Sequence, residues 1–189
     1  MVQSAVINEA IVFITALSLR AVIRRTPKEK LPESFRYFTV LSNLFCALTA
    51  LILLVAELFG AMPAWAVVLK YVGTAAVAVT LCTVFLYLLP ATRSLEGLLG
   101  SMPETVMHLI TPVLAILSFL GFEKGTMSAW AIPLAVLPVL LYGWLYLNRV
   151  VIAGTWRDFY GFNKGGKWKL SFSLMAAGAV IIAVLLWRL

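Results

Sequence analysis

The sequence predicts an all-α fold, an integral membrane bundle of six transmembrane helices that forms a single domain over residues 1–189. Hydrophobic residues make up 62% of the chain and charged residues only 12%, which is not the balance of a soluble domain. A helix needs about 20 predominantly apolar residues to cross a bilayer. Such runs occur at about residues 5–23, 37–59, 65–89, 106–122, 129–148 and 168–188.

The first run is expected to be a retained helix and not a signal peptide. No basic segment precedes it, and its positive charges follow the apolar core. Two short connections, 60–63 and 122–127, predict that runs two and three, and runs four and five, are antiparallel neighbours. The connections at the other end are longer, at 24–36, 91–103 and 149–167, and functional residues are expected there.

The distribution of positive charge predicts an orientation. Of the 15 Lys and Arg residues, twelve lie in or beside the connections after runs one, three and five. The positive-inside rule then places these connections in the cytoplasm, and the expected location is a bacterial inner membrane. A net charge of +7 could also suit nucleic acid, but the charges sit at helix ends. We therefore expect membrane lipids as partners and no nucleic acid.

No cofactor is expected. Cys46 and Cys82 lie inside separate apolar runs, which argues against a disulfide framework. Two thiols and one imidazole do not make a convincing zinc site, and a single His excludes a bis-histidine haem.

Two helix starts bear on the site. Ser101 and Glu104 form a capping-box pattern, which predicts that the fourth helix begins near residue 102. Pro32 predicts a start of the second helix nearby, because proline is tolerated in a first turn. Thr39 and His108 would then lie six or seven residues into their helices, at a common depth of about 10 Å.

His108 and Thr39 are the candidate catalytic residues. An imidazole inside a span is costly unless it is bonded or lines a wet cavity, and it suits proton transfer; a structural histidine that bridges helices is an equally open reading. Thr39 shares a helix face with Ser42 and Asn43, although most such threonines only support packing. Asn43 or Ser42 could stabilise an oxyanion, and for Asn43 a tie between helices is favoured. Glu104 could orient His108, but capping already explains it.

Other charged residues are less strongly indicated as part of a functional site. The segment 154–169 interleaves aromatic and charged residues, which would suit a lid or headgroup clamp, but an interfacial aromatic belt is favoured. Possible contacts at the mouth of the site are Arg149, Arg157 and Asp158, and Asp158 could pair with either arginine or with His108. Glu9, Glu57 and Lys70 are expected to pair in the outer half of the membrane.

Two short motifs carry a family resemblance. The residues Phe38-Thr39-Val40-Leu41-Ser42-Asn43 and His108-Leu109-Ile110-Thr111-Pro112 resemble the androgen-induced-protein family and its bacterial six-span relatives. The resemblance implies an intramembrane threonine hydrolase of fatty acyl esters, such as fatty acid esters of hydroxy fatty acids. Carried over by motif, Thr39 is the nucleophile and His108 the base.

Two other readings stay open from the sequence. The chain could be a non-enzymatic transporter or binding protein for lipids or small molecules, with a polar path through Thr39, Asn43, His108 and Glu104. Alternatively, these residues could bond to one another and only hold the helices together.

Overall fold

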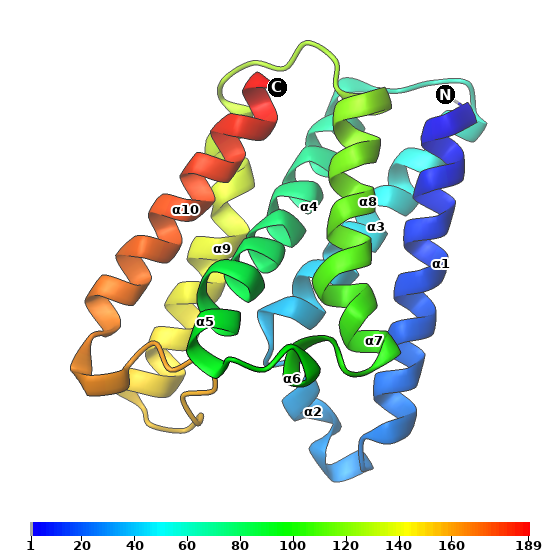
Figure 1. Ribbon diagram of the computed structural model, residues 1–189. Helices are drawn as coiled ribbons and strands as arrows, with labels where there is room; N and C mark the ends of the chain where they lie inside the picture. The colour runs from blue at the N-terminus through cyan, green and yellow to red at the C-terminus, as the bar shows by residue number, and fades with distance from the viewer. Residues whose placement is uncertain (1) are drawn as a thin grey trace.

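The bundle consists of six long helices, each long and apolar enough to cross a membrane (Figure 1). The computed structural model describes residues 2–189, without the side chains of residues 91 and 97; Met1, the first residue of the predicted domain, lies outside the described residues. The six spans are Val2–Arg25, Phe38–Leu58, Ala64–Leu88, Met102–Glu123, Ala131–Ile152 and Trp168–Arg188. The predicted fold class is therefore confirmed, and no strand occurs in the described chain.

Several spans contain short π-helical segments. The spans are built from these elements: α1 (Val2–Arg25); α3 (Phe38–Leu58); α4 (Ala64–Thr83) with η2 (Val84–Leu88); α7 (Met102–Thr105), η3 (Val106–Ile110), α8 (Thr111–Ser118) and η4 (Phe119–Glu123); α9 (Ala131–Leu147) with η5 (Asn148–Ile152); and α10 (Trp168–Arg188). The connections hold η1 (Lys28–Lys30), α2 (Leu31–Ser34), α5 (Leu89–Thr92), α6 (Leu95–Leu99) and η6 (Lys164–Gly166).

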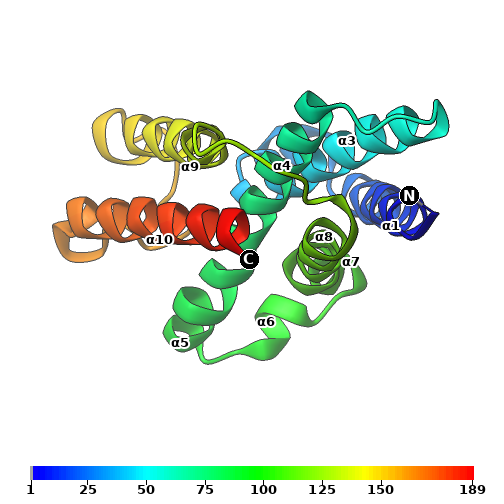
Figure 2. The ribbon, with the colours of Figure 1, turned by 90° about the horizontal axis from the view of Figure 1, so that it is seen from above.

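The α4 helix is the centre of the bundle. It contacts α3, α8, α9 and α10 and is the most buried of the six spans, whereas α1 and α10 are the least buried. Seen from above, α4 crosses between the pair α9 and α10 and the group α1, α7 and α8 (Figure 2). Its many small residues allow this close approach: at Gly73 an added Cβ would lie only 3.2 Å from Cα of Cys46 in α3.

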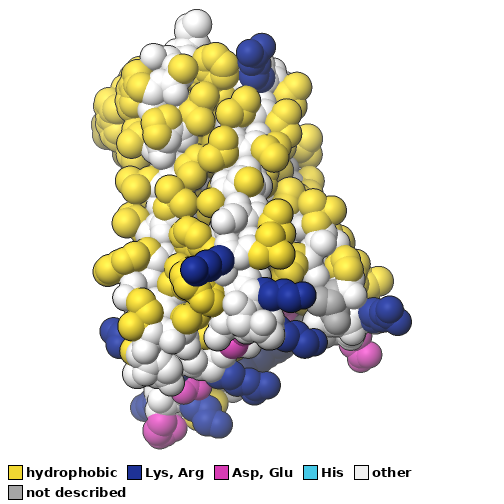
Figure 3. All heavy atoms as spheres, turned by 90° about the vertical axis from the view of Figure 1, so that its left-hand side faces the viewer, with side chains coloured by type: hydrophobic (Ala, Val, Ile, Leu, Met, Phe, Trp, Pro, Cys, Tyr) yellow, Lys and Arg dark blue, Asp and Glu magenta, His cyan; other side chains and the backbone are white. Residues whose placement is uncertain are grey.

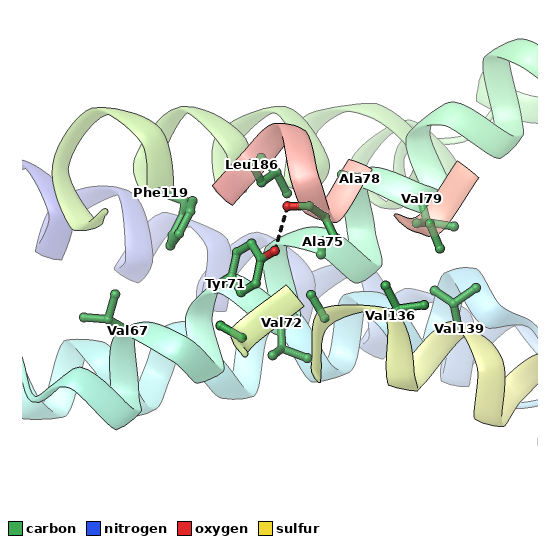
Figure 4. Packing of buried hydrophobic residues seen from close by; sticks show 14 of the residues in the cluster. Val67, Tyr71, Val72, Ala75, Ala78, Val79, Phe119, Val136, Val139 and Leu186 are labelled. Atoms are coloured by element: carbon green, nitrogen blue, oxygen red, sulfur yellow. Dashed lines mark hydrogen bonds between the residues drawn. The ribbon is translucent and has the colours of Figure 1, made fainter. Parts of the chain in front are cut away.

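The core on the α9 and α10 side combines aromatic rings with small side chains of α4 (Figure 4). Tyr71 is fully buried, and its ring centroid lies 5.6 Å from that of Phe119. The Tyr71 hydroxyl donates to the Ala183 carbonyl at 2.6 Å, which ties α4 to the last turns of α10. Because a hydroxyl in an apolar core needs a partner, this bond fixes where the two helices meet.

The two ends of the bundle differ. Both termini lie at one end, which we name the terminal end, and the connections 26–37, 93–101 and 153–167 lie at the other, which we name the basic end (Figure 1). Most Lys and Arg residues belong to the basic end.

One predicted neighbour relation is wrong. The short connection after the fourth span was expected to place α8 beside α9, but α9 packs mainly on α4 and α10, and α4 lies between them (Figure 2). The connecting residues 124–130 contain no helix. Seven residues of extended chain span about 23 Å, which is enough to pass over α4.

The start of the second span also differs from the prediction. A helical turn does begin near Pro32, but α2 ends at Ser34 and α3 begins only at Phe38, after an extended Tyr37. Thr39 is therefore the second residue of its helix. By contrast, the predicted capping box of the fourth span is confirmed, since Glu104 N donates to Ser101 Oγ and Ser101 N donates to Glu104 Oε2.

Candidate functional site

Thr39 lies at the basic end of α3, where its backbone carbonyl gathers the neighbouring polar side chains. This carbonyl accepts hydrogen bonds from Ser42 Oγ at 3.2 Å and from Asn43 Nδ2 at 2.8 Å. The predicted polar face of α3 is thus present, and its centre is a carbonyl. The carbonyl of Thr39 is hydrogen-bonded to these side chains, whereas its hydroxyl makes no such bond to any described residue, and the residue is half-buried.

The Thr39 side chain lines a small cavity, which we name the Thr39 pocket. Its volume is about 20 Å³, which is room for about one water molecule. The lining residues come from α3, α4, η2, α9, α10 and the 153–167 connection: Phe38, Thr39, Val79, Thr80, Thr83, Val84, Leu88, Val139, Tyr142, Tyr160, Phe162 and Met175. The polar groups of this pocket are hydroxyls of Thr and Tyr, and no carboxylate or imidazole is among its lining residues.

A much larger hollow lies directly beside the Thr39 pocket, and we name it the groove. It measures about 800 Å³ and separates η2 from the first half of α10. Val79, Thr83, Phe162 and Met175 line both the groove and the Thr39 pocket. Only these shared side chains would therefore separate a lipid chain in the groove from the Thr39 pocket.

His108 points to a different neighbour. Its Nδ1 lies 2.6 Å from the carbonyl oxygen of Leu98 in α6, which makes Nδ1 the protonated nitrogen and leaves the lone pair on Nε2. The ring is half-buried, lies outside the lining of the Thr39 pocket and makes no hydrogen bond to Thr39. The structure therefore brings the two helices together without bringing the two side chains into contact.

The depths of the two residues explain part of this separation. Asn43 Nδ2 donates to the Met107 carbonyl at 2.9 Å, so these two residues lie at one level. Both helices run from the basic end to the terminal end, with Thr39 four residues before Asn43 and His108 one residue after Met107. At 1.5 Å per residue, the offset is about 7.5 Å along the axis. The expected common depth is wrong because α3 begins later than Pro32.

Ser42 and Asn43 act as ties between helices. The Ser42 hydroxyl lies 2.8 Å from that of Thr80 in α4. Both donors of the Asn43 amide are bonded to carbonyls, those of Thr39 and Met107, and its buried Oδ1 has no hydrogen-bond partner. Since an amide nitrogen has two protons, Asn43 has none left for an oxyanion in this arrangement.

Glu104 caps the fourth span, and the ring of His108 is oriented by Leu98 instead. The π-helical segment η3 has a local cause in Pro112, which lacks the amide that would bond the carbonyl of His108. The amide of Thr111 bonds to the carbonyl of Val106, five residues earlier. His108 therefore lies within a π-bulge, a feature that often accompanies functional sites.

The 153–167 connection is organised by Asp158. Its carboxylate accepts hydrogen bonds from the Tyr146 hydroxyl at 2.6 Å and from the amides of Phe162 and Asn163, both at 2.9 Å. Asp158 makes no ion pair with Arg149, Arg157 or His108 in the described chain, and both arginines are exposed and lie outside the groove.

The aromatic residues of this connection turn inward. Tyr160 Oη accepts a hydrogen bond from the Phe38 amide at 2.9 Å, and the rings of Tyr37 and Phe159 are 4.6 Å apart. Tyr160 thereby supplies the cap that the start of α3 lacks. Burial raises the pKa of Tyr160 to about 12, although the hydrogen bond from Phe38 lowers it. The connection is thus part of the wall of the Thr39 pocket and not simply an aromatic belt.

A second polar cluster, near the terminal end, was missed from the sequence. Glu123 Oε1 accepts from Ser4 Oγ at 3.0 Å, Asn8 Nδ2 at 2.7 Å and Ser118 Oγ at 2.5 Å. Lys70 Nζ donates to Asn8 Oδ1 at 2.5 Å and lies 3.8 Å from Glu123 Oε2. These five side chains are buried. Polar residues inside otherwise apolar spans were the available signal.

The expected pairing in this half of the molecule is therefore corrected. Lys70 pairs with Glu123, while Glu9 is exposed. Glu57 is buried, and neither of its carboxylate oxygens has a hydrogen-bond partner. Glu123 was overlooked because it falls just after the apolar run 106–122, yet the π-helical end of the span carries it inward.

Comparison with known proteins adds no family. No protein-family model, curated protein or solved structure matches this chain. Among the described residues, no group of three or more His, Cys, Asp or Glu side chains could hold a metal ion.

Proposed function

We propose that the protein is an intramembrane hydrolase of fatty acyl esters in which Thr39 is the nucleophile and His108 the base, with the basic end in the bacterial cytoplasm. The observation that carries the proposal is the wall shared by the Thr39 pocket and the groove. An acyl chain in the groove would bring its ester group to an unbonded hydroxyl. The family resemblance of the two short motifs supports the same pair.

In this reaction Thr39 Oγ attacks the ester carbonyl carbon, and its proton passes to Nε2 of His108. The carbon–oxygen bond to the alcohol breaks, and the alcohol leaves with that proton. Water then hydrolyses the acyl-threonine, giving the free acid and restoring Thr39.

The proposal includes a rearrangement near α6. Because the ring of His108 is bonded to Leu98 and lies outside the Thr39 pocket, it must leave α6 and move toward α3 when the ester binds. The tie from Asn43 to Met107 keeps the two helices adjacent during such a movement.

Kinetics of single and double variants test the pair. We expect Thr39→Ala, His108→Ala and the double variant to lose hydrolysis of a long-chain acyl ester to the same extent, because groups that act as a unit are not additive. Thr92→Ala, which removes an exposed hydroxyl at the same end of the bundle but outside the Thr39 pocket and the groove, is the matched control and should retain activity. Unchanged turnover in Thr39→Ala would refute the proposal, and activity kept by His108→Ala alone would refute the role of His108.

A second candidate is a lipid-binding protein without hydrolytic activity. The separation of Thr39 and His108 favours it, since the groove needs no catalytic pair. Covalent labelling distinguishes the two candidates: a fluorophosphonate should label Thr39 in the hydrolase and leave a pure binding protein unmodified.

A further inference from the structure

The groove has walls made of two regular helical faces. On the side of α4 and η2 the lining residues are Val79, Cys82, Thr83, Leu86 and Tyr87; on α10 they are Leu170, Ser171, Leu174, Met175, Gly178, Ala179 and Ile182. Both sets follow the spacing of three and four residues that defines one helix face. Two faces that could pack together are thus held apart.

The separation of these faces follows from where α10 is anchored. Near the terminal end, Tyr71 donates to Ala183, and the two helices touch (Figure 4). Toward the basic end they diverge, so that the start of α10 lies well away from α5 (Figure 2). The 153–167 connection bridges the gap, with the ring of Tyr87 5.4 Å from that of Phe162. The two helical walls of the groove therefore diverge toward the basic end (Figure 2).

The size and rims of the groove suit a lipid tail. Its volume of about 800 Å³ lies in the upper range of ligand sites, which is about 300–1,000 Å³. Leu86, Leu170 and Leu174 line it and are also exposed on the outside of the molecule. Gly178 leaves open space, since an added Cβ there would meet nothing within 4 Å. An acyl chain can enter sideways from the bilayer.

The mouth of the groove is positively charged. Lys164 and Lys167 line it, are exposed, and form no ion pair in the described chain. No acidic residue occurs between residues 159 and 189. The acid that precedes this stretch in the sequence, Asp158, already accepts hydrogen bonds from the Tyr146 hydroxyl and two backbone amides. Basic side chains gather toward the lower end of the face that carries α9 and α10 (Figure 3). The unpaired positive charges of Lys164 and Lys167 are complementary to the negative charge of a phosphate.

We infer that the groove is a binding site for one anionic phospholipid of the leaflet at the basic end, with an acyl chain between η2 and α10 and the phosphate at Lys164 and Lys167. The first turn of α10 lines the same mouth and adds unbonded amides at the positive end of a helix dipole. This inference goes beyond the proposed hydrolysis and holds whether or not Thr39 cleaves an ester.

Native mass spectrometry of the full-length protein in detergent tests the site, with dioleoyl phosphatidylglycerol compared with dioleoyl phosphatidylcholine. We expect the anionic lipid to bind at least about tenfold more tightly, since each surface Lys contributes about 1 kcal/mol. The double variant Lys164→Gln/Lys167→Gln should lose most of this preference. Its control, Lys28→Gln/Lys30→Gln, removes the same charge from another connection at the same end and should keep it.

A second pair of variants tests the acyl path. Gly178→Leu fills the open part of the groove and should weaken binding of both lipids at least about fivefold, an expectation that rests on the apolar area lost to the lipid. Gly121→Leu, at a glycine that also faces open space but lies outside the groove, is the control. Helical circular dichroism and a single size-exclusion peak establish that each variant is folded.

The inference is overturned if the two lipids bind equally, if the lysine pair at the groove has no more effect than Lys28 and Lys30, or if Gly178→Leu retains full binding. All measurements are repeated in Thr39→Ala. If Thr39→Ala loses hydrolysis but keeps the preference for the anionic lipid, the lipid site exists independently of the proposed reaction.

Discussion

Lys70 and Glu123 form a fully buried ion pair, with Nζ 3.8 Å from Oε2, and Asn8 bonds to both partners. The pair joins α4 to the end of the fourth span, and Asn8 adds α1. The three donors all bond to Oε1 of Glu123, while Oε2 has no hydrogen-bond partner and is matched only by the charge of Lys70. The position of α1 against α4 and η4 is thereby fixed by polar contacts.

Removing Lys70 should be strongly destabilising. Lys70→Met leaves the Glu123 charge without its counter-ion, and we expect a loss of about 3–5 kcal/mol in the free energy of unfolding. Lys70→Met/Glu123→Gln should recover part of this loss, because Gln keeps an acceptor for the hydroxyls of Ser4 and Ser118. Thermal unfolding in detergent measures both, and Lys124→Met is the control. A wild-type melting temperature for Lys70→Met would contradict the structural role of the pair.

The cap that Tyr160 provides for α3 predicts a dependence on pH. Tyr160→Phe leaves the Phe38 amide unbonded and should cost about 1–2 kcal/mol. The folded pKa of Tyr160 is about 12 and the ordinary value is 10, so the folded state holds the phenol proton more tightly. This contribution to stability is fully present below pH 10 and is lost as the pH rises toward 12.

The stability difference between the wild type and Tyr160→Phe should accordingly be largest below pH 10 and shrink by pH 12. Chemical denaturation at a series of pH values measures this difference. A gap that widens over this range would show that the phenol is not held in its neutral form.

Close packing at Gly73 predicts sensitivity to a single methyl group. Gly73→Ala places a Cβ against Thr49 and the backbone of Cys46, and we expect a loss of about 1–3 kcal/mol. Gly178→Ala, also in a transmembrane helix but facing open space, should change stability little or raise it slightly, since Ala favours helix. Equal melting temperatures of the two variants would argue against the tight contact between α3 and α4.

The tautomer of His108 can be observed directly because the chain has only one histidine. With ¹⁵N-labelled histidine, the neutral ring should show a protonated Nδ1 and an unprotonated Nε2, as the bond to Leu98 requires. A protonated Nε2 would contradict that bond and would remove the lone pair on which the proposed base depends.

The sequence by itself determined the class of the fold, the six spans and local features that depend on neighbouring residues. The apolar runs predict the spans because the bilayer admits only long apolar helices. The capping box at Ser101 and Glu104 was predictable because its two hydrogen bonds join residues three positions apart. The ties at Ser42 and Asn43 were foreseen as one polar face, although their partners were not.

The tertiary structure decided which distant residues meet. The α3 helix begins at Phe38, where Tyr160, 122 residues later, accepts the hydrogen bond of the first amide. This start places Thr39 and His108 at different depths. Likewise, Lys70 meets Glu123 and not Glu57, and the groove exists because α10 is anchored to α4 at one end only. The periodicity of apolar residues along one helix does not show which other helices are its neighbours. The arrangement of helices around the bundle depends on the packing of side chains from all six spans.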